Sequence, residues 1–193
     1  MEEGKKRFRG PVFFMNHPFF ASVCGISLRQ YFESPQEMMK AQLKAFELTG
    51  YQNPLLPDFG VVPVASGFGC RVVFDNIGIP GCESLEAEEL EELDGLEPAD
   101  PKGENYMGKA LEYLAYMKKY KPEGIQAGPS LLMGPVTVAS LIRGTTDFCM
   151  DIFDDPKRVN RLLDVITETS VSYLKAQEEI LGSLKHLVVS EIG

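Results

Sequence analysis

The side chains best suited to acid–base chemistry stand directly after two short apolar segments. Asn16 and His17 follow the segment 11–15, and Asp58 follows the two leucines of the segment 51–58. Histidine and aspartate can take up or release a proton, and both can orient a polar substrate. If both segments are parallel strands, their carboxyl ends share the edge of the sheet at which active sites are built. Asp58 and His17 are therefore candidate catalytic residues, and Asn16 is a candidate substrate-binding residue.

Both candidate catalytic residues also have a structural interpretation. Asp58 could cap a helix that begins near Phe59, and His17 could be a loop residue hydrogen-bonded to the backbone ahead of Pro18. The pattern alone leaves the cap and the catalytic role open for Asp58. Of the two histidines in the chain, His17 is the better candidate, because His186 begins a strand and lies at the end associated with stability.

Two further positions at strand ends are candidates for substrate binding. Gly134, Pro135 and Thr137 form a predicted strand-to-helix turn, in which Pro135 suits the first helical position. The helix N-terminus there could face an anionic group, although turn geometry alone also explains these residues. Glu191 follows the last apolar segment and could face the same edge or solvent. We expect Gly134, Thr137 and Glu191 to bind substrate.

The sequence carries no readable metal or nucleotide motif. Its four cysteines form no C-x-x-C pair and have no histidine nearby in the sequence. The segment 67–69, Gly-Phe-Gly, lacks the third glycine and the lysine of a nucleotide-binding loop. We expect no metal to be bound by motifs of this chain alone, and we expect Cys24, Cys70 and Cys149 to be reduced, small buried side chains.

Short apolar segments alternate with amphipathic helices along the chain. Strands are expected at 11–15, 51–58, 71–74, within 124–133 and at 186–192. Helices are expected between Ser34 and Gly50 and at 105–120, 135–142 and 155–182. The alternation is typical of βα units and a parallel sheet, so we expect an α/β fold. One domain would cover 11–193, behind a flexible basic tail at 1–10.

The charge of the chain is concentrated in one acidic segment. The 193 residues carry a net charge of −9, and the segment 83–104 holds ten acids and one lysine, a net of −9 by itself. We expect this segment to be an insertion with a solvated face, or a docking site for a basic partner. The charge balance argues against nucleic acid. With no apolar run of about 18 residues and no secretory signal, we expect no membrane contact and a cytoplasmic protein.

Three blocks of the sequence resemble the uroporphyrinogen decarboxylase superfamily. They are PVFFMNHPFFASVCGIS from Pro11, LLPDFGVVPVASGFGCRV from Leu55, and GPVTVASLIRGTTDFCMDIFDDPKRVNRLLDVITE from Gly134. They look closest to the branch that moves methyl groups between corrinoid proteins and thiols or other acceptors. The resemblance implies a (β/α)8 TIM barrel, of which this chain would be about the N-terminal half. The sequence given would then end within the barrel domain, just after the strand expected at 186–192.

The resemblance also implies which site features to expect. The arginine-rich first loop of the decarboxylase corresponds to residues 16–20, which contain no arginine, so a polyanionic tetrapyrrole would lack its bidentate partners. Asp58 matches the key aspartate of the decarboxylase, and this resemblance favours the catalytic role of Asp58 over the helix cap. The later active-site tyrosine of the decarboxylase falls near Leu141. The methyltransferase branch holds zinc with a His-x-Cys pair and a distant cysteine, and residues 1–193 contain no His-x-Cys. Zinc and a corrinoid are thus implied by resemblance alone, with zinc ligands beyond residue 193 or absent.

Three functions follow as hypotheses. The first is a methyltransferase that docks a corrinoid protein, with Asp58, His17 and Asn16 lining the site. The second is a uroporphyrinogen decarboxylase of tetrapyrrole biosynthesis, which would use Asp58 without a metal. The third is an inactive half barrel that forms a homo-oligomer or pairs with a missing C-terminal half, because a few parallel strands leave two unpaired edges.

Overall fold

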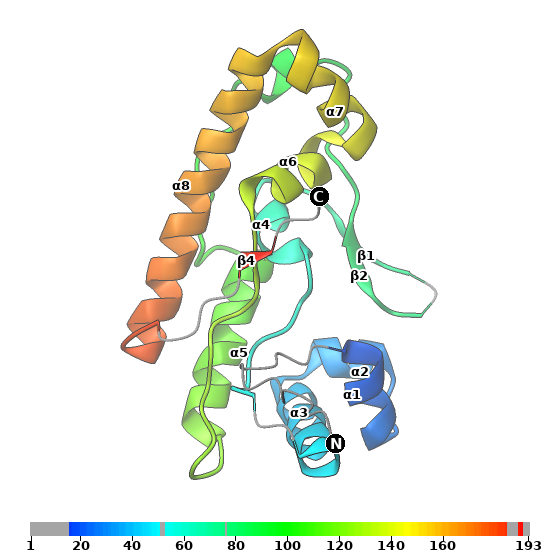
Figure 1. The fold of residues 1–193 in the computed structure, drawn as a ribbon, viewed down its shortest axis with the longest axis vertical. Helices are drawn as coiled ribbons and strands as arrows, with labels where there is room; N and C mark the ends of the chain where they lie inside the picture. The colour runs from blue at the N-terminus through cyan, green and yellow to red at the C-terminus, as the bar shows by residue number, and fades with distance from the viewer. Residues whose placement is uncertain (1–15, 51–52, 76, 185–188, 191–193) are drawn as a thin grey trace, which may run out of the picture.

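The computed structural model describes residues 16–50, 53–75, 77–184 and 189–190, and helices dominate this part of the chain (Figure 1). The helices are α1 (His17–Cys24), α2 (Leu28–Glu33), α3 (Pro35–Thr49), α4 (Val62–Gly67), the 3-10 helix η1 (Leu90–Leu93), α5 (Tyr106–Tyr120), α6 (Pro135–Arg143), α7 (Thr145–Asp154) and α8 (Pro156–Leu181). The strands are β1 (Val72–Phe74), β2 (Pro80–Cys82), β3 (Leu132–Met133) and β4 (Val189–Ser190). The fold is mixed α/β and mostly helical.

The boundaries of the long helices follow capping residues in the sequence. Ser34 caps α3, where its side chain accepts a backbone hydrogen bond at 3.2 Å. Asn105 and Asp155 cap α5 and α8 in the same manner. Gly50 and Gly182 end α3 and α8 in the left-handed conformation that glycine adopts without strain. The helices predicted from periodicity in these regions are confirmed.

Three helices lie where the sequence pattern predicts none. α1 and α2 occupy the region expected to be a loop after the first strand, and Asn16 and Ser27 cap them. α7 buries only Phe148, whereas Phe153 is 84% exposed. α7 has apolar residues at helical spacing, Phe148, Ile152 and Phe153, but only the first of them is buried.

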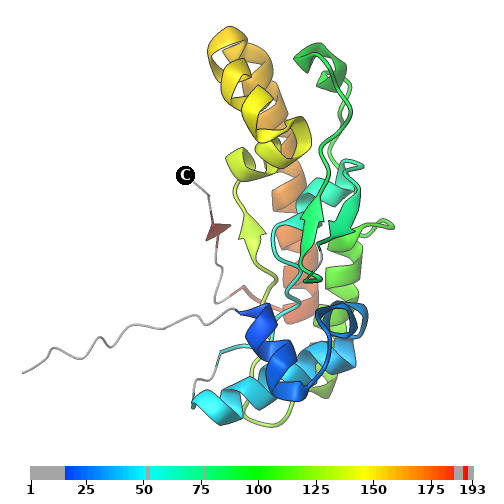
Figure 2. The same ribbon diagram turned by 90° about the vertical axis from the view of Figure 1, so that its right-hand side faces the viewer.

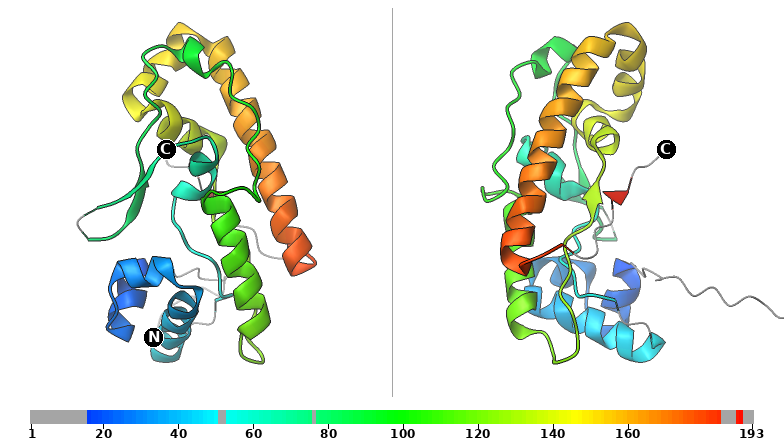
Figure 3. Two further views of the ribbon diagram at one scale, coloured as in Figure 1. Left: turned by 180° about the vertical axis from the view of Figure 1, so that it is seen from behind. Right: turned by 60° about the vertical axis from the view of Figure 1, so that its left-hand side comes forward.

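Parallel pairing joins segments that are far apart in the sequence. β3 pairs in parallel with β4, with Leu132 opposite Val189, and the two strands lie side by side in Figures 2 and 3. A single parallel bridge joins Leu55 to Ala127. The strand predicted at 51–58 is therefore one bridge over its described residues. The strand predicted at 186–192 is described only at 189–190, and the one predicted at 11–15 lies outside the described residues.

The strand predicted at 71–74 belongs to a hairpin and not to a parallel sheet. β1 and β2 pair antiparallel, with Val72 opposite Cys82. The carboxylate oxygen Oδ1 of Asp75 accepts backbone hydrogen bonds from Ile77, Gly78 and Ile79 at 2.7 to 2.9 Å. This turn chemistry favours a hairpin, because Asp stabilises a tight turn by bonding to the backbone ahead of it.

The acidic segment 83–104 is packed against the molecule and is not simply a solvated face. Leu90 and Leu93 of η1 are buried. The Arg143 guanidinium donates hydrogen bonds to the carbonyl oxygens of Ala87 at 2.6 Å and Glu88 at 3.2 Å. Many glutamates of the segment stay exposed, so the segment has one apolar side and one charged side.

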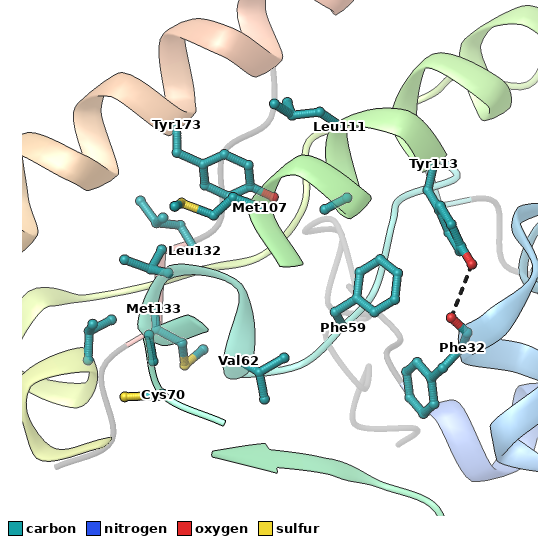
Figure 4. Close-up of a cluster of buried hydrophobic side chains, with 14 of the residues drawn as sticks. Phe32, Phe59, Val62, Cys70, Met107, Leu111, Tyr113, Leu132, Met133 and Tyr173 are labelled. Carbon is teal, nitrogen blue, oxygen red and sulfur yellow. Dashed lines mark hydrogen bonds between the residues drawn. The ribbon is translucent and has the colours of Figure 1, made fainter. Parts of the chain in front are cut away.

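A buried cluster connects the N-terminal helices to the rest of the chain (Figure 4). The Tyr113 hydroxyl of α5 donates a hydrogen bond to the carbonyl oxygen of Phe32 at 3.1 Å. The Phe59 ring packs beside this bond in tilted geometries, with its centroid 5.0 Å from that of Tyr113 and 6.2 Å from that of Phe32. Met107 and Met117 of α5 are fully buried and extend the core from this cluster along the helix. Over the described residues, no helix is both long and apolar enough to cross a membrane.

Gly108→Ala is expected to destabilise the fold by about 1–3 kcal/mol, although alanine normally stabilises a helix interior by about 1 kcal/mol. The reason is that a Cβ on Gly108 would collide with the carbonyl oxygen of Gly103. Urea unfolding measures the change. Gly95→Ala is the control, because a Cβ there meets nothing within 4 Å. An unchanged or increased free energy of unfolding for Gly108→Ala would contradict the packing described.

Candidate active site

His17 and Asp58 form an ion pair where α1 meets the segment that precedes α4. The His17 Nε2 atom lies 2.6 Å from Asp58 Oδ2. The Asp58 side chain is fully buried, and 17% of the His17 side chain is exposed. Beyond this contact, Asp58 Oδ2 has no hydrogen-bond partner among the described residues. The structure therefore brings the two predicted catalytic residues together, with the histidine on the solvent side.

Side chains of α3 hold the segment that carries Asp58. The carboxamide of Gln42 accepts the Leu56 N–H at 3.1 Å and donates to the Leu56 carbonyl oxygen at 2.8 Å. One turn earlier on α3, the sulfur of Met38 accepts the Asp58 N–H at 3.4 Å. Both backbone groups of Leu56 and the N–H of Asp58 thus bond to side chains of α3, as buried backbone groups need partners.

Neither structural interpretation of the pair holds. Val61 occupies the cap position of α4 and makes no side-chain cap, so Asp58 is not a helix cap. Asp58 Oδ1 instead accepts the N–H of Gly60 at 3.3 Å, in a turn where Gly60 has a φ of 61°. His17 is the first residue of α1 and therefore is not a loop residue.

Aromatic rings surround the solvent-shielded side of His17. The ring lies 5.4 Å from Phe32 in an edge-on geometry and 6.3 Å from Tyr31. Burial disfavours the charged imidazole, but the hydrogen bond and negative charge of Asp58 outweigh it, so the pKa of His17 is raised above 6.5. Burial and the charge of Asp58 likewise raise the pKa of Tyr31 well above 10. Tyr31 therefore stays neutral.

This arrangement suits proton transfer at a partly exposed imidazole. Nε2 faces the buried carboxylate, which leaves Nδ1 as the ring atom able to exchange a proton with a substrate. A carboxylate behind a histidine orients the ring and stabilises its charged form. In the charged form, the ring could hold an anionic group such as a thiolate or carboxylate.

The raised pKa of His17 predicts that stability falls as pH increases. Its folded pKa lies above its ordinary value of 6.5, so the stabilisation is fully present below that value and is lost as pH rises through the folded pKa. Urea unfolding measured from below pH 6.5 to above the folded pKa of His17 should show that the free energy of unfolding falls in the unmodified protein. It should not show this fall in His17→Gln. The buried thiols of Cys70 and Cys82 do not interfere, because burial raises their pKa values to about 11 and about 12. A fall of equal size in both proteins would contradict the pairing.

The other predicted site residues have local roles in the structure, and their substrate contacts remain predictions. Asn16 caps α1, where its Oδ1 accepts the Phe19 N–H at 3.0 Å. Gly134 occupies the cap position of α6, and Thr137 is buried in that helix. α6 packs against α4, α7 and α8. Glu191 lies outside the described residues.

Gln42 and Tyr31 are the residues of this site that sequence reasoning missed. Gln42 is 2% exposed and donates to the Tyr31 hydroxyl at 3.1 Å. A signal was present, because Gln42 stands four residues after Met38, on the buried face of α3. A polar side chain on an apolar helix face needs buried partners.

The described residues do not fit a zinc site. Among them, no group of three or more histidine, cysteine, aspartate or glutamate side chains is arranged to hold a metal. All four cysteines are free, and Cys149 is exposed, which corrects the expectation that it is buried. No step proposed below involves zinc.

Comparisons with known proteins bear on both fold and family. A methyltransferase from Methanosarcina mazei has a similar structure, with a TM-score of 0.68 and 20% sequence identity over 89% of this chain. The chain spans 50% of the length of that protein. None of the curated proteins matches the chain. The model of the uroporphyrinogen decarboxylase family (URO-D) matches residues 3–180, and the family and the structural neighbour together imply a TIM-barrel fold. Because the match covers most of the sequence, the chain belongs to the uroporphyrinogen decarboxylase family.

Proposed function

We propose that the protein transfers a methyl group between a corrinoid protein and a thiol or similar acceptor, with His17 and Asp58 handling the proton of the acceptor. The observation that carries the proposal is the ion pair of a mostly buried imidazole with a fully buried carboxylate. The similarity in structure to a methyltransferase supports the same reaction class.

The proton of the acceptor is the part of the reaction that this pair suits. A thiol attacks a methyl group as its thiolate, so the S–H proton must leave. Neutral His17 can accept it at Nδ1, and the charged ring then holds the thiolate by a hydrogen bond. The sulfur–carbon bond forms as the bond between the methyl group and its donor breaks, and the bonding electron pair stays with the donor. Asp58 balances the charge that His17 gains.

The corrinoid belongs to a partner protein in this proposal. The carboxylates on the exposed side of the segment 83–104 offer a surface complementary to a basic partner. Zinc, if the reaction uses it, would need ligands outside the described residues.

Decarboxylation of uroporphyrinogen is the second candidate, and the retained buried carboxylate of Asp58 favours it. Two features disfavour it. Residues 16–20 contain no arginine to bind substrate carboxylates. Asp58 is already paired with His17, so a substrate cation would have to compete with the imidazole for the carboxylate.

An assay with two substrates separates the candidates. The protein is incubated with free methylcobalamin and 2-mercaptoethanol, and loss of the methyl–cobalt absorbance is followed. A parallel reaction contains uroporphyrinogen without metal. The proposal expects demethylation that depends on protein and thiol, and no coproporphyrinogen. Coproporphyrinogen formation without demethylation would establish the second candidate in its place.

A further inference from the structure

A buried side chain of α3 bonds directly to the segment that carries Asp58. Gln42 is 2% exposed and lies in the core. Its carboxamide bonds both backbone groups of Leu56, at 3.1 and 2.8 Å. These two bonds reproduce what a neighbouring strand would give to that residue. Backbone bonds from Leu55 to Gln126 and Gly128 hold the preceding residue, and Gln42 extends this support by one residue toward Asp58.

The position of Leu56 controls that of Asp58 because Pro57 lies between them. Proline fixes its own φ and restricts the residue before it to extended conformations. The chain from Leu56 to Asp58 therefore has little freedom. Met38 accepts the Asp58 N–H at 3.4 Å, so α3 contacts both ends of this short segment.

The same carboxamide also reaches the other side of the pair. Gln42 Nε2 donates to the Tyr31 hydroxyl at 3.1 Å, and the ring of Tyr31 lies 6.3 Å from that of His17. Asp58 and Tyr31 are the titratable side chains that the described structure places against His17. Gln42 thus contacts a support of each member of the pair and neither member itself.

We propose that Gln42 is the positioning residue of this site, and that its buried carboxamide holds the Asp58 carboxylate within contact of His17. The inference rests on the proposed function for the use of the site, but the placement can be tested without any activity. Loss of the carboxamide leaves both backbone groups of Leu56 without these bonds and lets the Asp58 carboxylate move away from His17. The carboxylate then stabilises the charged imidazole less.

The test is an NMR titration of the His17 ring in Gln42→Met. Methionine conserves length and removes the hydrogen bonds. The His186→Gln variant assigns the two histidine signals. Gln177→Met is the matched control, because Gln177 is equally buried and accepts the Ser130 N–H at 2.7 Å from the distant helix α8. The expected result is a downward shift of the His17 titration midpoint in Gln42→Met and an unchanged midpoint in Gln177→Met. An unchanged midpoint in folded Gln42→Met would overturn the proposal, whatever the methyl-transfer assay shows.

A second measurement serves if Gln42→Met does not fold. Hydrogen exchange of the Leu56 amide in the unmodified protein reports on the same bond, because the acceptor of that amide is the Gln42 side chain. Protection comparable to that of amides within α3 supports the proposal. Exchange at the rate of an unstructured amide would contradict it, since the carboxamide would then not hold the segment.

Discussion

Asp58→Asn is expected to lower the rate of the proposed reaction by about 10²- to 10⁴-fold, the usual contribution of general acid–base catalysis. Asparagine keeps the shape of the side chain and removes its charge. The buried carboxylate is what raises the pKa of His17 against the effect of burial, so the variant leaves an imidazole that is less basic and less well oriented. The rate is measured as kcat/KM for demethylation of methylcobalamin at several pH values.

The control for this experiment is Asp164→Asn. Asp164 lies on the exposed face of α8, so its substitution tests whether the loss of any carboxylate changes the rate. We expect kcat/KM to be unchanged in that variant. Similar rates for Asp58→Asn and the unmodified protein would remove Asp58 from the mechanism.

Arg143→Met is expected to destabilise the fold by about 3 kcal/mol, as is typical when one partner of a buried ion pair is removed. The Arg143 side chain is 6% exposed and its Nε lies 2.7 Å from Asp151 Oδ2. It also donates to the carbonyl oxygens of Ala87 and Glu88. Removing it leaves a shielded carboxylate and two carbonyl groups without their donor, and it releases the acidic segment from α6.

Arg161→Met is the matched control for the stability measurement. The Arg161 side chain is 62% exposed and pairs with Asp94 at 3.3 Å, a surface contact worth about 1 kcal/mol or less. Urea unfolding of both variants gives the difference in their free energies of unfolding, provided that the slope of free energy against urea concentration is the same. Equal small losses would show that Arg143 does not hold the acidic segment in solution.

The sequence was most informative where local chemistry decides the structure. Ser34, Asn105 and Asp155 mark helix starts through their own side chains, so three long helices could be predicted. α7 has no side-chain cap to mark its start, and the local chemistry that marks the other helices is therefore missing there. The hairpin β1–β2 was mistaken for part of a parallel sheet because three residues of a strand read alike in either setting.

In the candidate site, too, local patterns could be read from the sequence and tertiary contacts could not. The positions of His17 and Asp58 after apolar segments predicted that they share one face, and their contact at 2.6 Å is consistent with this. The contacts of Gln42 depend on how α3 packs on the segment 56–58, which no local pattern encodes. The arginine contacts of the segment 83–104 also depend on tertiary packing, so composition alone suggested a solvated face.

The pH dependence of methyl transfer in the unmodified protein and in His17→Gln tests the central claim most directly. The rate in the unmodified protein should increase with pH, because neutral His17 is the proposed proton acceptor. The inflection should lie above pH 6.5, because the pKa of His17 is raised above that value. The same inflection should be absent from His17→Gln, whose rate should be low throughout. Identical profiles in the two proteins would contradict the account, because the proton of the acceptor would then be handled elsewhere.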